Sequence, residues 1–204
     1  MKIYEFDGFP NPARVRMAIA EKGLTDQVEF IQVDVPNGEH RTPEFLAKNP
    51  AGVVPVLELD DGTMIAECTA ITEYLDRSDD APTLTGHTAK ERATVHMMQR
   101  RAEAEVLDAV AAYFHHATPG LGPDIEQNQC AEWGMIQRER AVKGMAYLDQ
   151  VLSENLFLAG DQFSMADITA YAGLAFADFA GVPIAAEHSN LISWRERVGQ
   201  RYAN

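Results

Sequence analysis

Several features that would point to particular protein classes are absent from this chain. It has two cysteines in 204 residues, Cys68 and Cys130, which lie far apart and form no CxxC pair. This pattern fits a reducing compartment and argues against a disulfide framework or a zinc site. No apolar run reaches the roughly 18 residues of a membrane-spanning helix. The opening MKIYEFDGF lacks a charged region followed by a long apolar stretch, so we expect no secretory signal and a cytoplasmic location.

Positive charge is also scarce. The chain has 17 Lys and Arg against 31 Asp and Glu, a formal net charge of −14. A surface this acidic repels phosphate backbones and anionic lipid, so we expect neither nucleic acid nor membrane as a partner. An anionic small molecule would need donors placed locally at its site.

Strand and helix patterns alternate over the first eighty residues and then give way to helices. The order is β-α-β-α-β-β-α, with the first two strands parallel and the last two antiparallel across Asp60-Asp61-Gly62. The expected strands are Lys2–Phe6, Val28–Val33, Val54–Leu59 and Met64–Ala66, and the helices between them 12–22, Pro43–Lys48 and Glu67–Arg77. The later helices are expected at Ala89–Ala117, Asp124–Glu154, Met165–Phe179 and Asn190–Gln200. This predicts an α+β protein with a domain 1–77, a linker 78–87 and an all-helical domain 88–204.

Local signals predict where two of these helices begin. Asn11 has the residue type of an N-cap, with Pro12 as the first helical residue and Gly23 as the stop. Ser164-Met-Ala-Asp167 is a capping box, which nucleates a helix and is not expected to bind a ligand.

Three stretches together carry a family resemblance: NPAGVVPVL (Asn49–Leu57), ECTAITEYL (Glu67–Leu75) and FLAGDQFSMADI (Phe157–Ile168). In their order and spacing the chain resembles the cytosolic glutathione transferase family, in a bacterial, theta-like form. The resemblance covers essentially the whole chain. It implies a thioredoxin-like N-terminal domain that binds glutathione as co-substrate, and a helical domain that lines the electrophile site and contributes to a homodimer.

The resemblance also implies how glutathione binds. The Val54-Pro55 bond would be cis, which turns the backbone of Val54 toward the cysteinyl part of glutathione. The start of the helix at Glu67 and Cys68 would hold the γ-glutamyl end, since a helix start favours a carboxylate. The glycyl carboxylate would be bound by His40 or Arg41, although a solvated loop position suits either residue equally.

Two departures from the family pattern weaken these expectations. Many relatives have a Lys or His just before the Val-Pro pair, where this chain has the uncharged Gly52 and Val53. The family usually has Ser where this chain has Cys68. A helix start can make a thiol reactive, while an inert substitute for the capping residue is the other reading, and both stay open. In either case Cys68 lies at the γ-glutamyl end, away from the sulfur of glutathione.

The activating residue of the family is missing. Relatives use Tyr, Ser or Cys near the end of the first strand or the start of the first helix, and the position that best matches the theta-type serine is Phe9. Three substitutes remain: the side-chain amide of Asn11, a backbone N–H of Asn11 or Ala13, and the hydroxyl of Tyr4. Asn11 is preferred, because Tyr4 shares a strand face with Phe6 and is expected to be buried.

Aromatic residues at the end of Ala89–Ala117 line the electrophile site in the family, which makes Tyr113 and His116 candidates here. A core or helix-capping role suits them as well, because His near a helix C-terminus complements the dipole. No metal is expected, since the adjacent His115 and His116 point about 100° apart on a helix.

The resemblance therefore implies a cytoplasmic detoxification enzyme that conjugates the glutathione thiolate to small hydrophobic electrophiles. Two alternatives remain open. The first is a glutathione-dependent disulfide reductase, and the second is a non-catalytic glutathione-binding or interaction protein that keeps the fold.

Overall fold

The computed structural model describes residues 1–202. The predicted helical domain 88–204 includes residues 203 and 204, which lie outside the described residues. The chain divides into two compact units, Met1–Leu84 and a second from Thr85 onwards. The division falls inside the segment 78–87.

The first unit contains a four-stranded sheet in the order β2-β1-β3-β4. β1 and β2 are parallel, whereas β3 pairs antiparallel with both β1 and β4. The predicted β-α-β-α-β-β-α order is confirmed, and Gly62, at φ 85°, closes the predicted hairpin. The elements are β1 (Lys2–Glu5), α1 (Pro10–Glu21), β2 (Glu29–Gln32), α2 (Pro43–Leu46), β3 (Val56–Glu58), β4 (Met64–Ala66) and α3 (Cys68–Arg77).

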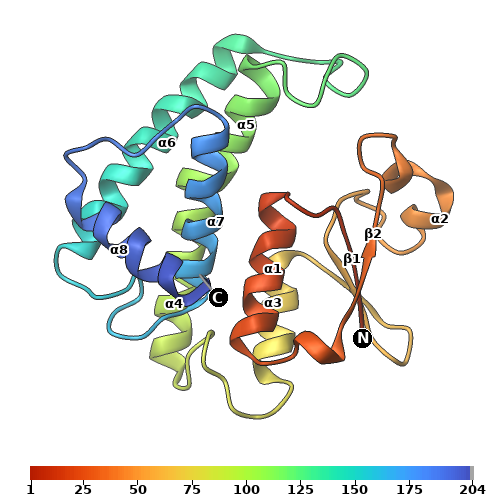
Figure 1. The fold of residues 1–204 in the computed structure, drawn as a ribbon, viewed down its shortest axis with the longest axis horizontal. Coiled ribbons are helices and arrows are strands. Elements are labelled where there is room, and N and C mark those ends of the chain that lie inside the picture. The colour runs from red at the N-terminus through yellow and green to blue at the C-terminus, as the bar shows by residue number, and fades with distance from the viewer. Residues whose placement is uncertain (203–204) are drawn as a thin grey trace. The chain divides into compact units, whose positions relative to one another are not determined.

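Side chains that alternate along the strands build a separate core on each face of the sheet. On one face α1 and α3 run side by side (Figure 1) and pack on Ile3 and Leu57. On the other face Tyr4 and Val56 pack with Phe45 of α2. The turn from β1 into α1 thus lies beside α3, at the end of the layer that the two helices form.

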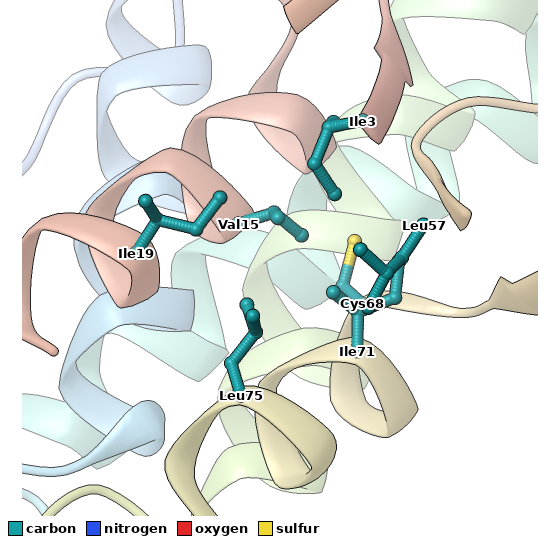
Figure 2. Packing of buried hydrophobic residues seen from close by; sticks show 7 residues of the cluster. All are labelled: Ile3, Val15, Ile19, Leu57, Cys68, Ile71 and Leu75. Atoms are coloured by element: carbon teal, nitrogen blue, oxygen red, sulfur yellow. The ribbon is translucent and has the colours of Figure 1, made fainter. Parts of the chain in front are cut away.

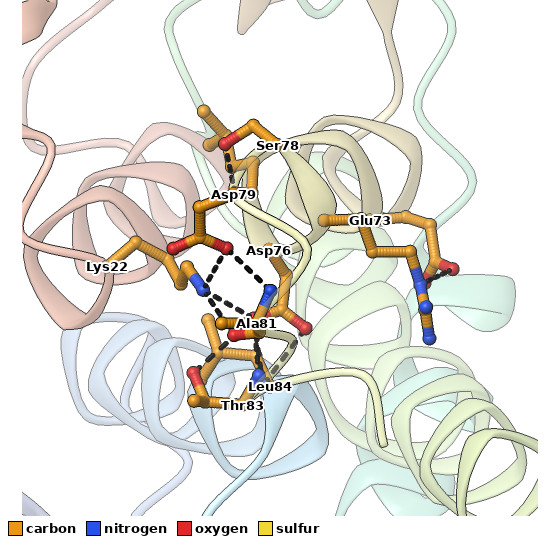
Figure 3. Close-up of polar contacts among 10 residues, drawn as sticks. Lys22, Glu73, Asp76, Ser78, Asp79, Ala81, Thr83 and Leu84 are labelled. Atoms are coloured by element: carbon orange, nitrogen blue, oxygen red, sulfur yellow. Dashed lines mark hydrogen bonds and ion pairs between the residues drawn. The ribbon is translucent and has the colours of Figure 1, made fainter. Parts of the chain in front are cut away.

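The segment after α3 is fixed to the first unit by the buried carboxylate of Asp76. It accepts hydrogen bonds from the backbone N–H groups of Thr83 and Leu84 at 2.8 and 3.0 Å. The ammonium group of Lys22 contacts both Asp76 and Asp79 (Figure 3), at distances of 3.5 Å and 3.1 Å. The first part of the predicted linker therefore has a defined conformation, held by the ends of α1 and α3.

The second unit is helical over the part that the structure describes. Its helices are α4 (Ala89–Ala102), α5 (Asp108–Ala117), α6 (Ala131–Leu152), α7 (Met165–Phe179) and α8 (Ser189–Gly199). The predicted helix Ala89–Ala117 is continuous but contains a π-helical segment, Glu103–Leu107, between α4 and α5. Here α6 approaches closely, because a Cβ added at Gly144 would lie 2.4 Å from the carbonyl oxygen of Glu105.

The predicted helix Asp124–Glu154 is wrong at its start, since α6 begins at Ala131. Residues 118–130 form a loop in which the side chains of Glu126 and Gln129 have hydrogen-bond partners without a helix. The carboxylate of Glu126 accepts from the N–H of Leu121 at 2.9 Å and lies 2.7 Å from Nδ1 of His115. The amide of Gln129 donates to the carbonyl groups of His115 and Thr118.

The predicted capping box at the start of α7 is confirmed. Its Asp167 is fully buried and accepts hydrogen bonds from Ser164, from the N–H of Leu158 and from the indole of Trp194. Burial raises the pKa of Asp167 to about 6, against these hydrogen bonds, which favour the ionised form. Asp167 thus joins the start of α7 to α8.

Candidate active site at the start of the first helix

The turn between β1 and α1 corrects one prediction. Phe9, in an extended conformation, is the N-cap and Pro10 is the first helical residue, so Asn11 is not the N-cap. The physical reason is that proline suits the first helical position and favours an extended conformation in the residue before it, while a second proline is tolerated inside the first turn, where no N–H is needed. The sequence has prolines at 10 and 12, and the helix begins at the earlier one. No side chain caps this helix start.

As a consequence, one backbone N–H group in the first turn has no partner within residues 1–202. Pro10 and Pro12 have no N–H, and the N–H of Ala13 donates to the carbonyl of Phe9 at 3.0 Å. Asn11 is the second helical residue, where a helix offers no internal acceptor. Among the described residues the Asn11 N–H has no hydrogen-bond partner, so it is the donor that this end of α1 presents.

The side-chain amide of Asn11 has a defined orientation. Its oxygen Oδ1 accepts a hydrogen bond from Nη1 of Arg14 at 3.0 Å. A guanidinium group can only donate, so the atom that faces Arg14 must be the oxygen. The two N–H bonds of the amide therefore point away from Arg14, and Asn11 itself is exposed. Sequence reasoning missed Arg14, although its i, i+3 spacing from Asn11 on a helix is the signal of such a pair.

The turn is held to the sheet by a polar network around the buried carboxylate of Glu5. Arg16 of α1 binds this carboxylate with two nitrogen atoms. Gln32 of β2 donates to it at 3.1 Å and accepts from the N–H of Asp7 in the turn at 2.9 Å. β1, β2, α1 and the turn are thereby connected through charged and amide groups.

Tyr4 and Phe9 offer no free hydroxyl to this site. The hydroxyl of Tyr4 donates to the carboxylate of Glu58, and this bond is the main cause that lowers the pKa of Glu58. The ring of Tyr4 is buried on the α2 face of the sheet, as expected, with the ammonium group of Lys48 4.7 Å from its centre. Phe9 is half-buried and packs against Phe6 with a centroid distance of 4.6 Å.

The Val54-Pro55 bond is cis, as the resemblance implied. Neither the N–H nor the C=O of Val54 has a hydrogen-bond partner within residues 1–202. The carbonyl of the preceding Val53, in contrast, accepts from the side-chain amide of Asn49 at 2.8 Å. Val54 therefore offers one donor and one acceptor next to β3.

Glu67 and Cys68 form the start of α3. Glu67 is the N-cap and has a φ of 71°, a left-handed conformation that a residue other than glycine adopts at a cost of about 1–3 kcal/mol. Cys68 is 7% exposed, and its sulfur points into the cluster of Ile3, Val15 and Leu57 (Figure 2). The thiol donates to the backbone carbonyl of Asn11 at 3.4 Å. This contact brings the starts of α1 and α3 together, and it directs the Cys68 sulfur into the core.

His40 and Arg41 lie in a short turn before α2. His40 is 8% exposed, and its buried Nδ1 atom has no hydrogen-bond partner among the described residues. Burial, and secondarily the charge of Arg41, lower the pKa of His40. Arg41 is exposed. Gly52 contacts this turn, since an added Cβ there would lie 3.3 Å from the His40 carbonyl oxygen.

The two electrophile-site candidates lie in the last turns of α5, in the second unit. The ring of Tyr113 lies 5.9 Å from the guanidinium carbon of Arg138. Nδ1 of His116 accepts the N–H of Cys130, the residue before α6, at 3.1 Å. His116 thus has a structural partner at the residue before α6.

Residues 1–202 contain no group of three or more His, Cys, Asp or Glu side chains that could hold a metal ion. None of their helices is both long enough and apolar enough to cross a membrane.

Comparison with known proteins identifies the family. Residues 10–78 match the glutathione S-transferase N-terminal domain and residues 99–197 the C-terminal domain. Glutathione S-transferase 2 of Saccharomyces cerevisiae is 56% identical over 98% of this chain and 86% of its own length. The chain belongs to the glutathione S-transferase family.

Solved structures agree with this assignment. A glutathione S-transferase domain-containing protein of Marinobacter aquaeolei is 62% identical, with a TM-score of 0.97 and 98% of both chains covered. A glutathione S-transferase of class Gtt2 from Vibrio parahaemolyticus is 34% identical, with a TM-score of 0.82, covering 97% of this chain and 92% of that one. The thioredoxin-like N-terminal unit and the all-helical C-terminal unit are the architecture of this family.

Proposed function

We propose that this protein is a glutathione transferase that adds the glutathione thiolate to small hydrophobic electrophiles, with Asn11 as the residue that stabilises the thiolate. The observation that carries the proposal is the start of α1. There the backbone N–H of Asn11 has no partner in the part of the chain that the structure describes, and its side-chain N–H bonds point away from Arg14. Both donors belong to one residue at the positive end of a helix, where a negative charge is favoured.

The chemistry requires a donor of this kind. An ordinary thiol has a pKa of about 8.5, so little thiolate exists at neutral pH. A hydrogen bond to a charged group contributes about 1.5–3 kcal/mol, which corresponds to roughly one to two units of thiol pKa. The thiol proton leaves to solvent, and the remaining electron pair on sulfur attacks the electrophilic carbon. Asn11 acts as a donor throughout and takes up no proton.

The other groups would bind the rest of glutathione. Val54, before the cis Pro55, offers its free N–H and C=O to the cysteinyl part. Glu67 and the backbone N–H of Cys68, at the start of α3, would bind the γ-glutamyl end. Phe9 would form an apolar wall beside the sulfur.

The glycyl carboxylate is assigned to the turn before α2. His40, which is 8% exposed in the turn before α2, is one candidate ligand. The exposed Arg41 is the second candidate for the same carboxylate.

Several finer points are part of the proposal. We propose a cytoplasmic homodimer that acts in detoxification, of bacterial origin and theta-like, with Tyr113 and His116 in the electrophile site. Exposed apolar side chains on α4 and α6, among them Met97, Met135 and Val142, support a further protein contact.

The test compares wild type with Asn11→Ala and Asn11→Asp. Conjugation of a chloronitrobenzene is the readout, in which a carbon–sulfur bond forms and chloride leaves. Asp keeps an acceptor for Arg14, and both variants keep the backbone N–H but lack the side-chain N–H donors, so we expect both to lose about 10-fold or more of kcat/KM. If Asn11→Asp keeps wild-type activity while Asn11→Ala loses it, Asn11 serves only as the partner of Arg14 and the assignment is wrong.

Two other readouts separate the alternatives. Reduction of a small disulfide without conjugation would identify a reductase. A rise in Tm with glutathione, but no turnover of either substrate, would identify a binding protein. Either result would refute the transferase.

A further inference from the structure

We propose that Arg14 is a positioning residue for thiolate activation, which holds the Asn11 amide with its N–H bonds toward the glutathione sulfur. The inference rests on the proposed function. In this role the buried guanidinium group of Arg14 does not contact glutathione. It influences the glutathione sulfur only by orienting Asn11.

The geometry of the pair supports this role. Arg14 lies three residues after Asn11 on α1, and its Nη1 atom is 3.0 Å from Oδ1 of Asn11. An isolated asparagine amide can turn over, exchanging its oxygen and nitrogen at little cost, because the two ends have nearly the same shape. Arg14 removes this freedom, since a guanidinium group presents only donors. An amide in the reverse orientation would place N–H against N–H at Arg14 and direct its oxygen toward the thiolate.

Arg14 is itself well placed to act as a fixed support. Its residue is only 4% exposed, although arginine is among the side chains least often buried. It is on a 12-residue helix whose other buried residues, such as Val15 and Ile19, pack on the sheet. A donor that is held on a rigid helix and oriented by a second buried group loses little conformational freedom when the ligand binds. A precise binding site needs this arrangement.

The charge of Arg14 and one further contact support this arrangement. The positive charge of Arg14 draws electron density toward the amide oxygen and makes the N–H bonds of Asn11 stronger donors. On the other side, the thiol of Cys68 donates to the backbone carbonyl of Asn11 at 3.4 Å. The side chain and the backbone of Asn11 are therefore each held by a different buried residue.

A direct electrostatic effect of the Arg14 charge on the thiolate is the competing explanation. It predicts that Arg14 lowers the thiol pKa whether or not an amide stands at position 11. The positioning role predicts that the effect of Arg14 disappears when the amide is removed. A double-mutant cycle separates the two.

The experiment measures the pKa of enzyme-bound glutathione from the ultraviolet absorbance of its thiolate over a pH series. The proteins are wild type, Arg14→Met, Asn11→Ala and the double variant. We expect Arg14→Met to raise the pKa of the bound thiol by about one unit in the Asn11 protein, a roughly tenfold loss of thiolate at neutral pH. In the Asn11→Ala background we expect the same substitution to change it by less than about 0.3 units. Arg77→Met, which removes a guanidinium group on α3 that is paired with Glu73, is the matched control and leaves the pKa unchanged.

An equal rise in both backgrounds, or none in either, would overturn the positioning role. If Arg14→Met does not fold, Arg14→Gln is measured in the same cycle, because its amide can present either an acceptor or a donor to Asn11 and so no longer fixes the orientation of the Asn11 amide. It must also raise the pKa only when Asn11 is present. Failure of the proposed function looks different: the thiol of glutathione bound to the wild-type protein would then keep its solution pKa, and Asn11→Ala would not change it.

Discussion

Replacing Asp167 by Asn tests how the helical unit is held together. The two carboxylate oxygens accept from Leu158, Trp194 and Ser164, at 2.9–3.0 Å. Every one of these partners donates, so the NH₂ group of an asparagine would face donors at one of the two oxygen positions. A buried donor left without an acceptor costs about 1–3 kcal/mol. We expect Asn at this position to lower the free energy of unfolding by about 2–3 kcal/mol at pH 7.5.

The destabilisation caused by Asp167→Asn should be larger at acidic pH than at neutral pH. The pKa of Asp167 is raised from 3.8 to about 6 in the folded protein, so the folded state binds the proton more tightly than the unfolded state. Protonation therefore stabilises the wild type as the pH falls through 6, and this contribution is complete below 3.8 and absent well above 6. With these two values the contribution at pH 5 is about 1.4 kcal/mol. The Asn variant lacks this contribution. The difference in the free energy of unfolding between the two proteins should therefore increase by that amount from pH 7.5 to pH 5.

Urea unfolding of both proteins at the two pH values measures this gap. The fluorescence of the buried Trp194 and circular dichroism serve as independent probes. All other titrating groups are common to both proteins and cancel in the difference. A gap that is constant, or that narrows in acid, would show that Asp167 is ionised over the whole range and would refute the argument from burial.

Three further predictions concern single residues. Tyr4→Phe should keep conjugation within about twofold of wild type, because the hydroxyl of Tyr4 is bound to Glu58; a loss as large as that of Asn11→Ala would restore Tyr4 as the activating residue. Gly144→Ala should destabilise the protein by about 1–3 kcal/mol in thermal unfolding, whereas Gly173→Ala, where the nearest atom is 3.3 Å away, should cost less; the reverse order would contradict the packing. His40, whose pKa is lowered in the free protein, should become protonated against a carboxylate, so S-methylglutathione should bind more tightly at pH 6 than at pH 7 in calorimetry. His40→Gln should abolish this dependence, and an unchanged dependence would remove His40 from the glycyl site.

Features that depend on neighbouring residues in the chain were predicted well. Asp61-Gly62 marks the hairpin between β3 and β4, and Ser164 to Asp167 marks the start of α7. Both signals satisfy backbone groups within a few residues, so no information about the rest of the fold is needed.

The predictions were wrong where contacts with segments distant in the sequence determine the local structure. The π-helical segment is where Gly144 of α6 lies against Glu105, which neither local sequence reveals. The start of α6 was misplaced because Glu126 and Gln129 bind groups at the end of α5 instead of extending the helix.

The candidate site was predicted in part. Asn11 was selected as a donor, but its expected capping role was wrong, because two prolines in FPNP could each begin the helix and only the earlier one does. The partner of the Tyr4 hydroxyl depends on the pairing of β1 with β3, which the pattern of either strand alone does not contain. The burial of His40 depends likewise on how its turn folds.

We propose that the start of α1 lowers the pKa of the thiol of bound glutathione through Asn11. The most direct measurement is the thiol pKa of glutathione bound to the wild-type protein and to Asn11→Asp, from the absorbance of the thiolate. We expect a wild-type value at least one unit below the roughly 8.5 of an ordinary thiol, and a value at or above 8.5 in Asn11→Asp. A bound thiol that titrates near 8.5 in the wild type, or equally low in both proteins, would contradict it.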